Sequence, residues 1–333
     1  MQMNISRRIC VAPMMDWTDR HCRYFLRLLS KHTLLYTEMI TAKALIHGNT
    51  KRLLQFNPSE HPIALQLGGN DVQELMQAAR LGEQHGYDEI NLNVGCPSNR
   101  VQRGQFGVCL MLQPELVRDC VAAMQVAVHV PVTVKCRIGV DRQTSYQFLK
   151  NFVLTVAEGG CQTFIIHARN AWLNGLSAKE NRHIPPLRYD LVYRLKEELP
   201  QLQIVINGGI KTHAEIDKHL SLVDGVMLGR AIYHDPYLLS EMDRRYFVSN
   251  AAIHTREKVI EQMLCYIKNE QQSGVYLSKI TRHMLGLFQG QPGAKQWRRA
   301  LSTLAVRANA DKRVVQRALA MVNAEAEKQQ QNS

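Results

Sequence analysis

The chain has 333 residues, 45% of them hydrophobic, so it is long enough to bury a full core as one large domain or two unequal ones. Its eight cysteines include no C-x-x-C pair, which excludes a local redox dithiol, and its longest apolar stretch, VAAMQVAVHVPVTV, falls below the roughly 18 residues of a membrane span. The formal net charge of +12 is typical of a protein that binds nucleic acid or another anionic surface.

Short runs of β-branched and aliphatic residues alternate with longer amphipathic segments along the first 230 residues. Eight runs are strand-like, namely 9–14, 34–39, 62–67, 90–94, 131–139, 163–169, 203–209 and 225–230. Helix-length segments lie between them, such as 71–86 and 113–128. Strands that alternate with helices in this way pair in parallel through right-handed crossovers. The sequence therefore predicts an α/β fold of the (β/α)8 TIM-barrel type.

A doubly wound α/β sheet is the competing architecture. Such a sheet usually carries a glycine-rich dinucleotide turn after its first strand. The corresponding segment here, VAPMMDW, contains no glycine. This difference favours the barrel.

From about residue 248 the pattern changes to helical periodicity without strands. Four amphipathic segments follow one another, at 255–272, 277–288, 294–306 and 312–328. Residues 251–333 hold 13 Lys and Arg against 6 Asp and Glu, which fits either a solvated helical surface or a surface for nucleic acid. We therefore expect a barrel domain over residues 1–247 and a smaller, basic, all-α helical-bundle domain over residues 248–333.

Barrel enzymes carry their functional residues on the loops that follow the strands. Here nearly every predicted strand ends in residues suited to binding or catalysis. They are Pro13, Met14, Met15, Glu38, Gln66, Asn93, Cys96, Lys135, Arg137, His167, Arg169, Asn207, Gly208, Gly209, Gly229 and Arg230. Gln66 and Asn93 offer amides that could meet the edge of a heterocycle, and His167 could hydrogen-bond a ring or a phosphate.

The last two strand ends, INGGI and LGRA, predict a phosphate site. In barrels a phosphate is often bound by the loops after strands seven and eight. Glycines at 208, 209 and 229 allow the backbone to come close to a ligand, and Arg230 adds positive charge. Tight turns that need glycine are the alternative interpretation of the same residues.

Lys135 lies in the middle of an apolar strand, where an uncompensated ammonium group would be costly to bury. It therefore needs an anionic partner. The residues alone leave three partners open: a reduced flavin, a substrate carboxylate or a Schiff-base carbonyl compound.

Cys96 follows a predicted strand in the segment INLNVGCPSNRV. A single thiol on such a turn is either a small buried hydrophobic residue or a catalytic group. Pro97 restricts the turn and would help to aim the sulfur. Two other cysteines, Cys109 and Cys136, are interpreted as core residues.

Several segments, in chain order, resemble the flavin-dependent tRNA-dihydrouridine synthases. They are VAPMMDWTDRHCRYFLR, LLYTEM, PIALQLGG, YDEINLNVGCPS, VTVKCRIG, FIIHAR, INGGI and GVMLGR. The resemblance covers residues 9 to about 247. Two further segments, HARNAWLNGLSAKENRHIPPL and ITRHMLGLFQGQPGAKQWRR, narrow it to the synthase A subfamily.

The resemblance implies FMN at the top of the barrel, NADPH as the reductant, and no metal. It implies that Pro13, Met14 and Met15 line the flavin, and that Gln66, Lys135 and His167 contact its ring and ribityl chain. It places the phosphate on Asn207, Gly208, Gly209, Gly229 and Arg230, the same residues that predict a phosphate site without it.

The activity implied by the resemblance is reduction of uridine to 5,6-dihydrouridine at D-loop positions 20 and 20a of tRNA. Hydride would pass from reduced flavin N5 to C6, and Cys96 would protonate C5 from the other face. A thiol suits this role because it stays mostly protonated at neutral pH yet can give up its proton. Asn93 would contact the uracil edge, and Arg182, Arg298 and Arg299 would orient the tRNA.

Three other interpretations remain: another FMN barrel oxidoreductase acting on a small molecule, a barrel that only binds RNA, and a phosphosugar lyase with Lys135 as its Schiff-base residue. The basic helical segment argues against a small substrate. We expect a cytoplasmic protein, because the cysteines lie in apolar segments and the N-terminal apolar run is short for a signal peptide. We also expect a monomer.

Overall fold

The structure is a computed structural model, and it describes residues 5–331. The chain divides into two compact units. The first comprises residues 5–16 and 33–229, and the second comprises residues 17–32 and 230–331. The domain boundary predicted after residue 247 falls inside the second unit. The assignment of a catalytic role to residues 1–247 and an RNA-binding role to residues 248–333 stays a prediction.

The first unit contains one sheet of nine parallel strands. They are β1 Ile9–Val11, β2 Leu34–Tyr36, β3 Ile40–Thr41, β4 Ile63–Gly68, β5 Glu89–Val94, β6 Val132–Arg137, β7 Thr163–His167, β8 Gln203–Asn207 and β9 Gly225–Leu228. The strand order is β2-β1-β9-β8-β7-β6-β5-β4-β3, and a further pairing of β2 with β4 closes the ring. All strands except β3 form a closed parallel barrel, so the predicted TIM barrel is confirmed.

The predicted strand 34–39 is in fact two short strands, β2 and β3. Tyr36 pairs with Ala64, and Ile40 pairs with Leu67. The segment from β2 to β3 therefore contains one residue more than the part of β4 that it faces. The segment between them carries Glu38, whose carboxylate accepts a hydrogen bond from the backbone N–H of Asp16 at 2.5 Å. The interruption therefore directs Glu38 toward the loop that follows β1.

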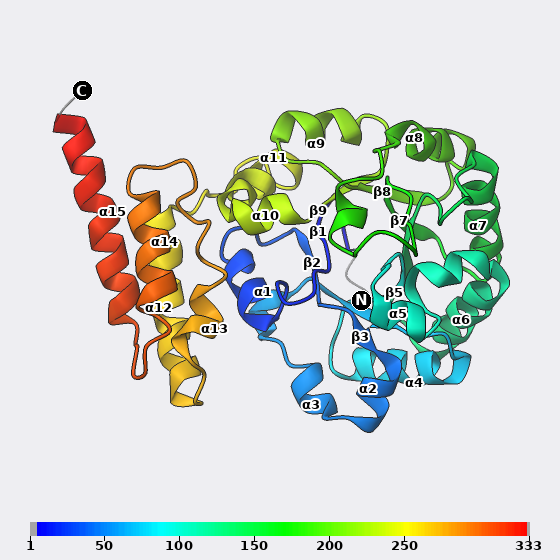
Figure 1. Cartoon of the computed structure of the whole chain (residues 1–333), viewed down its shortest axis with the longest axis horizontal. Coiled ribbons are helices and arrows are strands. Elements are labelled where there is room, and N and C mark those ends of the chain that lie inside the picture. The colour runs from blue at the N-terminus through cyan, green and yellow to red at the C-terminus, as the bar shows by residue number, and fades with distance from the viewer. Residues whose placement is uncertain (1–4, 332–333) are drawn as a thin grey trace. The chain divides into compact units, whose positions relative to one another are not determined.

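Helices connect the strands of the first unit. They are α2 Ala42–His47, α3 Thr50–Leu53, α4 Val72–Gln84, α5 Asn99–Arg103, α6 Pro114–Ala127, α7 Tyr146–Glu158, α8 Tyr189–Glu198 and α9 His213–Leu220, with 3₁₀ turns η1 Pro58–Glu60, η2 Gly107–Leu112 and η3 Glu180–Arg182. Figure 1 shows α4, α6, α7, α8 and α9 outside the strands. Local signals set the helix ends; for example, Asp71 caps the start of α4, and Gly86 follows its end with a φ of 91°.

The barrel interior has an apolar sector and a polar sector. Its apolar sector is a buried cluster that includes Cys10, Tyr36, Ala64, Ile165, Val205 and Met227. Alternate residues of β5 and β6 supply the polar sector: Glu89, Asn91 and Asn93 from β5, and Thr133, Lys135 and Arg137 from β6. This second sector leads toward the carboxyl ends of the strands, where the candidate site lies.

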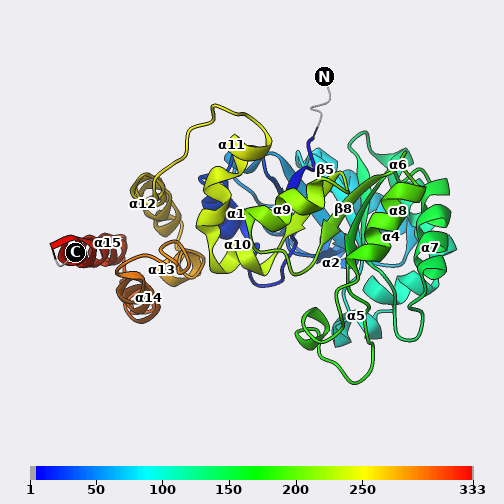
Figure 2. The same cartoon turned by 90° about the horizontal axis from the view of Figure 1, so that it is seen from above.

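The second unit is helical. It contains α1 Arg20–Arg27, α10 Arg230–His234, η4 Pro236–Glu241, α11 Met242–Tyr246, α12 Arg256–Gln272, α13 Leu277–Thr281, α14 Ala294–Thr303 and α15 Arg313–Gln331. The four helices predicted after residue 248 are therefore present, although α13 ends at Thr281, earlier than predicted. Figure 2 shows α12 to α15 in yellow to red. Gly293 permits close packing of α14 and α15, because a Cβ there would lie 2.7 Å from Cα of Val322.

The early helix α1 belongs to this unit through contacts with α12. The rings of Tyr24 and Tyr266 stack with centroids 3.9 Å apart. The Tyr266 hydroxyl also lies 2.7 Å from Nδ1 of His21, and Arg20 forms a 2.5 Å ion pair with Glu270. These pairs link residues more than 240 positions apart, which explains why the sequence pattern did not reveal the grouping.

Candidate active site

Five predicted site residues meet at the carboxyl ends of neighbouring strands. They are Gln66 on β4, Asn93 on β5, Lys135 on β6, His167 on β7 and Asn207 on β8. The strand register pairs Asn93 with Lys135 and His167 with Asn207. The barrel therefore brings together, at one end, the side chains that the sequence placed on separate strand exits.

The turn that carries Cys96 is fixed by the side chain of Asn93. Oδ1 of Asn93 accepts hydrogen bonds from the backbone N–H groups of Gly95 at 3.1 Å and Cys96 at 3.0 Å. The Cys96 thiol is half-buried and donates to the hydroxyl of Ser98 at 3.5 Å. The sulfur is thus held in a defined place on a turn with a fixed backbone.

Arg137 holds the same turn from the other side. Its Nε donates to the carbonyl of Gly95 at 2.9 Å, and its Nη1 donates to the carbonyls of Asn170 and Asn181, both at 3.0 Å. Burial lowers the pKa of Arg137 to about 10, and the nearby charge of Arg182 acts in the same direction. The guanidinium is still charged at neutral pH and connects the Cys96 turn to the loop after β7.

A second contact joins the loops after β5 and β7. Nε2 of Gln102 on α5 donates to the carbonyl of Pro97 at 2.8 Å and to the carbonyl of Leu173 at 3.0 Å. Figure 2 shows α5 and the green loop after β7 on the same side of the barrel. These two loops therefore support the position of Cys96 together.

Lys135 lies between Asn93 and Ile165 on the neighbouring strands of the predicted site. Its Nζ donates to Oδ1 of Asn207 at 3.2 Å, and Asn207 is oriented by its own donation to the carbonyl of Met227 at 2.7 Å. Burial lowers the pKa of Lys135 to about 8, and the charge of Arg137 adds to the effect. A lysine in this state would gain from an anionic ligand.

The turn after β8 requires glycine at two positions. Gly208 and Gly209 have φ values of 120° and 78°, which side chains rarely adopt. A Cβ at Gly209 would also lie 2.6 Å from Cδ1 of Leu187, and the hydroxyl of Tyr189 donates to the carbonyl of Gly208 at 2.6 Å. Gly209 is exposed, and a tight glycine turn at this strand end is an arrangement that binds phosphate groups in barrels.

These residues fit a flat heterocycle that carries a phosphate. The ammonium of Lys135 offers hydrogen bonds suited to a ring edge, and the Gly208 turn suits the phosphate. The amides of Gln66 and Asn207 lie beside Lys135 on neighbouring strands and are oriented by their own hydrogen bonds. Met15, on the loop after β1, is 54% exposed and offers an apolar surface for a ring. The donor set is therefore compatible with FMN. Within the described residues, no group of three or more His, Cys, Asp or Glu could hold a metal ion.

Comparison with known proteins identifies the family. The model of the dihydrouridine synthase family matches residues 10–323. The chain belongs to the dihydrouridine synthase family.

Curated relatives in this family are similar over nearly their whole length. The tRNA-dihydrouridine(20/20a) synthase of Vibrio parahaemolyticus serotype O3:K6 (strain RIMD 2210633) is 56% identical, over 96% of this chain and 98% of that protein. The protein of the same name from Escherichia coli (strain K12) is 58% identical, over 95% and 92%. That of Synechocystis sp. (strain ATCC 27184 / PCC 6803 / Kazusa) is 58% identical, over 93% of each chain.

A solved structure of a 2-naphthoyl-CoA reductase complex is similar in fold. Its TM-score is 0.55 at 11% sequence identity, and the match covers 71% of this chain and 49% of that chain. This similarity supports the barrel architecture alone.

In this member of the dihydrouridine synthase family, the residues predicted to bind RNA lie in both units. Asn93 belongs to the barrel, and Arg182 is exposed at the end of η3. Arg298 and Arg299 are exposed on α14, where Lys295 shares their face at i, i+3 and i+4 spacing. Arg230, predicted to bind phosphate, is the first residue of α10 in the second unit and directly follows Gly229.

The other cysteines examined in the sequence are core residues. Cys136 is fully buried, and burial raises its pKa to about 12. It alternates with Lys135 and Arg137 on β6, so it points away from the barrel interior. Cys109 is also buried. The interpretation of both as core residues is confirmed.

The sequence interpretation missed Ser98 and the positional role of Arg137. Ser98 precedes α5 but makes no capping bond with its side chain, so its hydroxyl can accept from Cys96. The tripeptide Cys-Pro-Ser before a short helix was the available signal. Arg137 was noted as a strand-end cation, but its three carbonyl partners come from distant segments.

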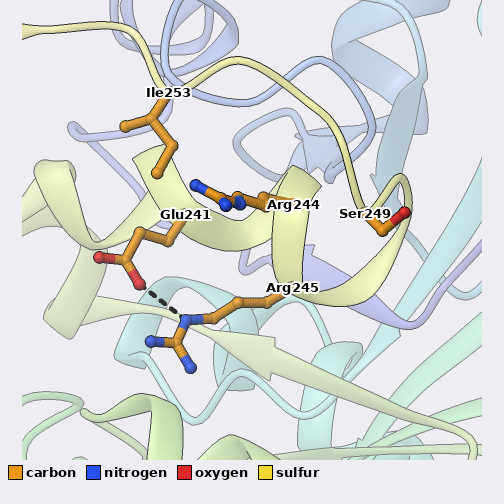
Figure 3. A pocket seen from close by; sticks show the side chains of 5 residues that line it. All are labelled: Glu241, Arg244, Arg245, Ser249 and Ile253. Carbon is orange, nitrogen blue, oxygen red and sulfur yellow. Dashed lines mark hydrogen bonds and ion pairs between the residues drawn. The ribbon is translucent and has the colours of Figure 1, made fainter.

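The second unit has a cavity of about 380 Å³ lined by Glu241, Arg244, Arg245, Ser249 and Ile253. Arg245 forms a 2.7 Å ion pair with Glu241, as Figure 3 shows. Both arginines are exposed, and none of the predicted site residues lines the cavity.

Among the described residues, every helix is too short or too polar to span a membrane.

Proposed function

We propose that this protein reduces uridine to 5,6-dihydrouridine at D-loop positions 20 and 20a of tRNA, with FMN as cofactor and NADPH as reductant. Relatives that are 56–58% identical over nearly the whole chain carry the name tRNA-dihydrouridine(20/20a) synthase. The observation that carries the proposal is the single half-buried thiol fixed at the carboxyl end of a barrel of this family.

Residues on or shortly after six strands, β1, β4, β6, β7, β8 and β9, would hold the cofactor. Lys135, Gln66 and His167 would contact the ring and ribityl chain, and the turn after Asn207, with Gly229 and Arg230, would bind the phosphate. Pro13, Met14 and Met15 would line the ring. A bound flavin supplies the hydride in such a reduction.

Cys96 would hold the proton that completes the product. In the proposed reaction its S–H bond breaks, and the proton forms a new C–H bond at C5 of the pyrimidine. The reaction needs the thiol on one fixed side of the base, and the bonds to Asn93 and Arg137 provide this constraint. Ser98 accepts from the thiol and so orients its proton.

The tRNA would reach this site by turning one base out of its stack. Asn93 uses Oδ1 for two backbone bonds and one N–H for Gln66, so within the described structure its second N–H is available for a uracil oxygen. Arg182, Arg298 and Arg299 would bind the tRNA backbone. We propose that the protein acts as a monomer in the cytoplasm.

The lowered pKa of Lys135 also fits a second function, Schiff-base chemistry on a carbonyl substrate. This alternative makes a different prediction: the purified protein would be colourless, and borohydride would trap a carbonyl compound on Lys135. An FMN absorption spectrum that survives purification would favour the proposed reductase.

The test is dihydrouridine formation by purified protein with NADPH and unmodified tRNA, comparing the wild type with Cys96→Ala. We expect Cys96→Ala to keep FMN and tRNA binding but to lose about 10²–10⁴-fold in turnover, because the proton donor is gone. The matched control is Cys265→Ala, which removes an exposed thiol from α12 in the second unit. Near-wild-type turnover by Cys96→Ala would remove Cys96 from the mechanism.

A further inference from the structure

A continuous chain of polar side chains crosses the barrel interior and ends at the Cys96 turn. It uses three neighbouring strands: Gln66 on β4, Glu89, Asn91 and Asn93 on β5, and Thr133 on β6. Each of these side chains is at most 8% exposed. Burying five polar groups is unfavourable unless all are hydrogen-bonded, so their bonds together specify one arrangement.

The upper half of the chain runs from the turn to the middle of β5. The backbone N–H groups of Gly95 and Cys96 donate to Oδ1 of Asn93. Nδ2 of Asn93 then donates to Oε1 of Gln66 at 2.8 Å. Nε2 of Gln66 donates in turn to Oδ1 of Asn91 at 2.8 Å.

The lower half runs from Asn91 to a carboxylate at the start of β5. Nδ2 of Asn91 donates to the hydroxyl of Thr133 at 2.8 Å, and this hydroxyl donates to Oε1 of Glu89 at 2.6 Å. Glu89 accepts two further bonds, from the hydroxyl of Tyr36 at 2.7 Å and from Nε of Arg7 at 2.7 Å. Every bond of the chain thus points toward Glu89.

The two ends leave the amides between them only one orientation. A backbone N–H can only donate, and a carboxylate paired with arginine can only accept. An amide that turned over would place two donors or two acceptors face to face, at side chains that are at most 8% exposed. The carboxylate at the start of β5 therefore determines which atom of Asn93 faces the Cys96 turn.

We propose that Thr133 and Glu89 are positioning residues for Cys96, because they fix the orientation of the Asn91, Gln66 and Asn93 amides and so the backbone of the turn. Neither residue reaches the turn itself; Glu89 lies roughly 13 Å from Asn93 along β5 at ~3.3 Å per residue. The inference rests on the proposed function, in which Cys96 gives a proton to the substrate.

The test compares Thr133→Val with wild type by two measurements. The first is the alkylation rate of Cys96 by iodoacetamide, followed on the Cys96 peptide by mass spectrometry. The second is kcat and KM for tRNA. Valine removes the hydroxyl at nearly constant shape. The amides of Asn91, Gln66 and Asn93 then lose their fixed orientation, so Oδ1 of Asn93 no longer holds the turn in one place. We expect alkylation to rise at least fivefold and kcat per bound FMN to fall about tenfold or more. FMN content and KM should change less than kcat, because the Lys135 and Gly208 contacts do not depend on the chain.

Two variants serve as controls. Thr133→Ser restores the hydroxyl and should return both measurements to within twofold of wild type. Thr281→Val removes a similarly buried hydroxyl from α13 of the second unit, one that donates to the backbone carbonyl of Leu277 and not to the chain, and should leave both unchanged. The proposal is overturned if Thr133→Val and Thr281→Val behave alike.

Two measurements keep the proposal testable if Thr133→Val does not fold. Asn91→Leu cuts the chain one step closer to the turn and should also accelerate alkylation. In the wild type itself, the backbone N–H of Cys96 should be protected from exchange with D₂O, and exchange at the rate of an open loop would contradict the proposal. If wild type forms no dihydrouridine, the proposed function fails, but alkylation and exchange still report on the chain.

Discussion

Two cations of the barrel interior, Lys135 and Arg137, are covered by the protein, whereas the cations on α14 of the second unit are exposed. Lys135 and Arg137 face the barrel interior and are hydrogen-bonded to an amide and to three backbone carbonyls. Arg298 and Arg299 are exposed on α14, a helix with no acidic residue. A buried cation with fixed partners can position a few atoms, while an exposed row of cations suits a long polyanion.

The comparison teaches that a covered cation and an exposed cation of this protein should respond differently to salt and to substitution, although both carry one positive charge. Buried cations act through short contacts that salt screens only weakly. Exposed cations act on tRNA by releasing counterions, so their effect depends on salt concentration. The following predictions test this difference, from the largest expected effect to the smallest.

Arg137→Ala should lower the free energy of unfolding by about 3–5 kcal/mol, because it leaves three backbone carbonyls without their charged donor. Urea denaturation followed by circular dichroism measures this. Arg188→Ala, which removes an exposed arginine paired with Asp190 at 2.7 Å, is the control and should cost at most about 0.5 kcal/mol. A loss below about 1 kcal/mol for Arg137→Ala would show that the buried cation does not hold the turn.

Reversing the charge of Arg298 and Arg299 together should weaken tRNA binding about 10- to 100-fold at low salt. The slope of log affinity against log salt should become shallower by about two, one for each lost phosphate contact. Filter binding at several salt concentrations measures both quantities, and FMN content should not change.

The control for this pair is Arg80→Glu with Lys218→Glu, which gives the same change in net charge from exposed positions on α4 and α9. It should reduce affinity much less. Equal losses in the two double variants would mean that total charge, not the surface of α14, determines binding.

The lowered pKa of Lys135 predicts a pH-dependent contribution to the stability of the flavin-free protein. Its pKa is about 8 when folded, against about 10.4 for an unfolded lysine. Between these values the unfolded chain binds more protons, so the free energy of unfolding rises with pH. Lys135→Met lacks this contribution. At pH 7 the variant should be more stable than wild type, because it buries no charge. This difference in the free energy of unfolding should shrink by about 2 kcal/mol between pH 7 and pH 10.

Urea denaturation of both proteins across this range provides the check. Because other groups titrate equally in both proteins, only the difference between them is interpreted. A difference that does not vary with pH would mean that the lysine keeps its ordinary pKa in the folded protein.

The smallest effect is expected at the cavity of the second unit (Figure 3). Arg245→Ala breaks an exposed ion pair with Glu241 and should change the free energy of unfolding by less than about 0.5 kcal/mol, with the change vanishing in 1 M salt. Thermal denaturation at low and high salt measures this. A loss comparable to that of Arg137→Ala would contradict the contrast between buried and exposed cations.

Local pattern predicted most of the fold. Short β-branched and aliphatic runs located the barrel strands, and period-3.6 runs located α12, α14 and α15, because such elements show in the sequence which residues they bury. The division of β2 and β3 was missed because a one-residue change of register leaves no local mark. The grouping of α1 with α12 depends on pairs such as Tyr24 and Tyr266, which are far apart in the sequence.

The candidate site was predicted in part. Strand ends identified Lys135, Asn207 and Cys96 as candidates, and the family resemblance supplied their proposed roles. The chain from Glu89 through Thr133 was not predicted. Gln66 and Asn93 were candidates as strand-end amides, but Glu89, Asn91 and Thr133 lie before the strand ends and gave no signal. Their connection appears only when the register of β4, β5 and β6 brings the side chains together.

The most direct test maps dihydrouridine by mass spectrometry in tRNA from a strain that lacks this protein. We expect uridine at positions 20 and 20a in that strain, restoration of dihydrouridine by the wild-type protein, and no restoration by Cys96→Ala. Dihydrouridine that persists at both positions without the protein, or returns fully with Cys96→Ala, would contradict the account.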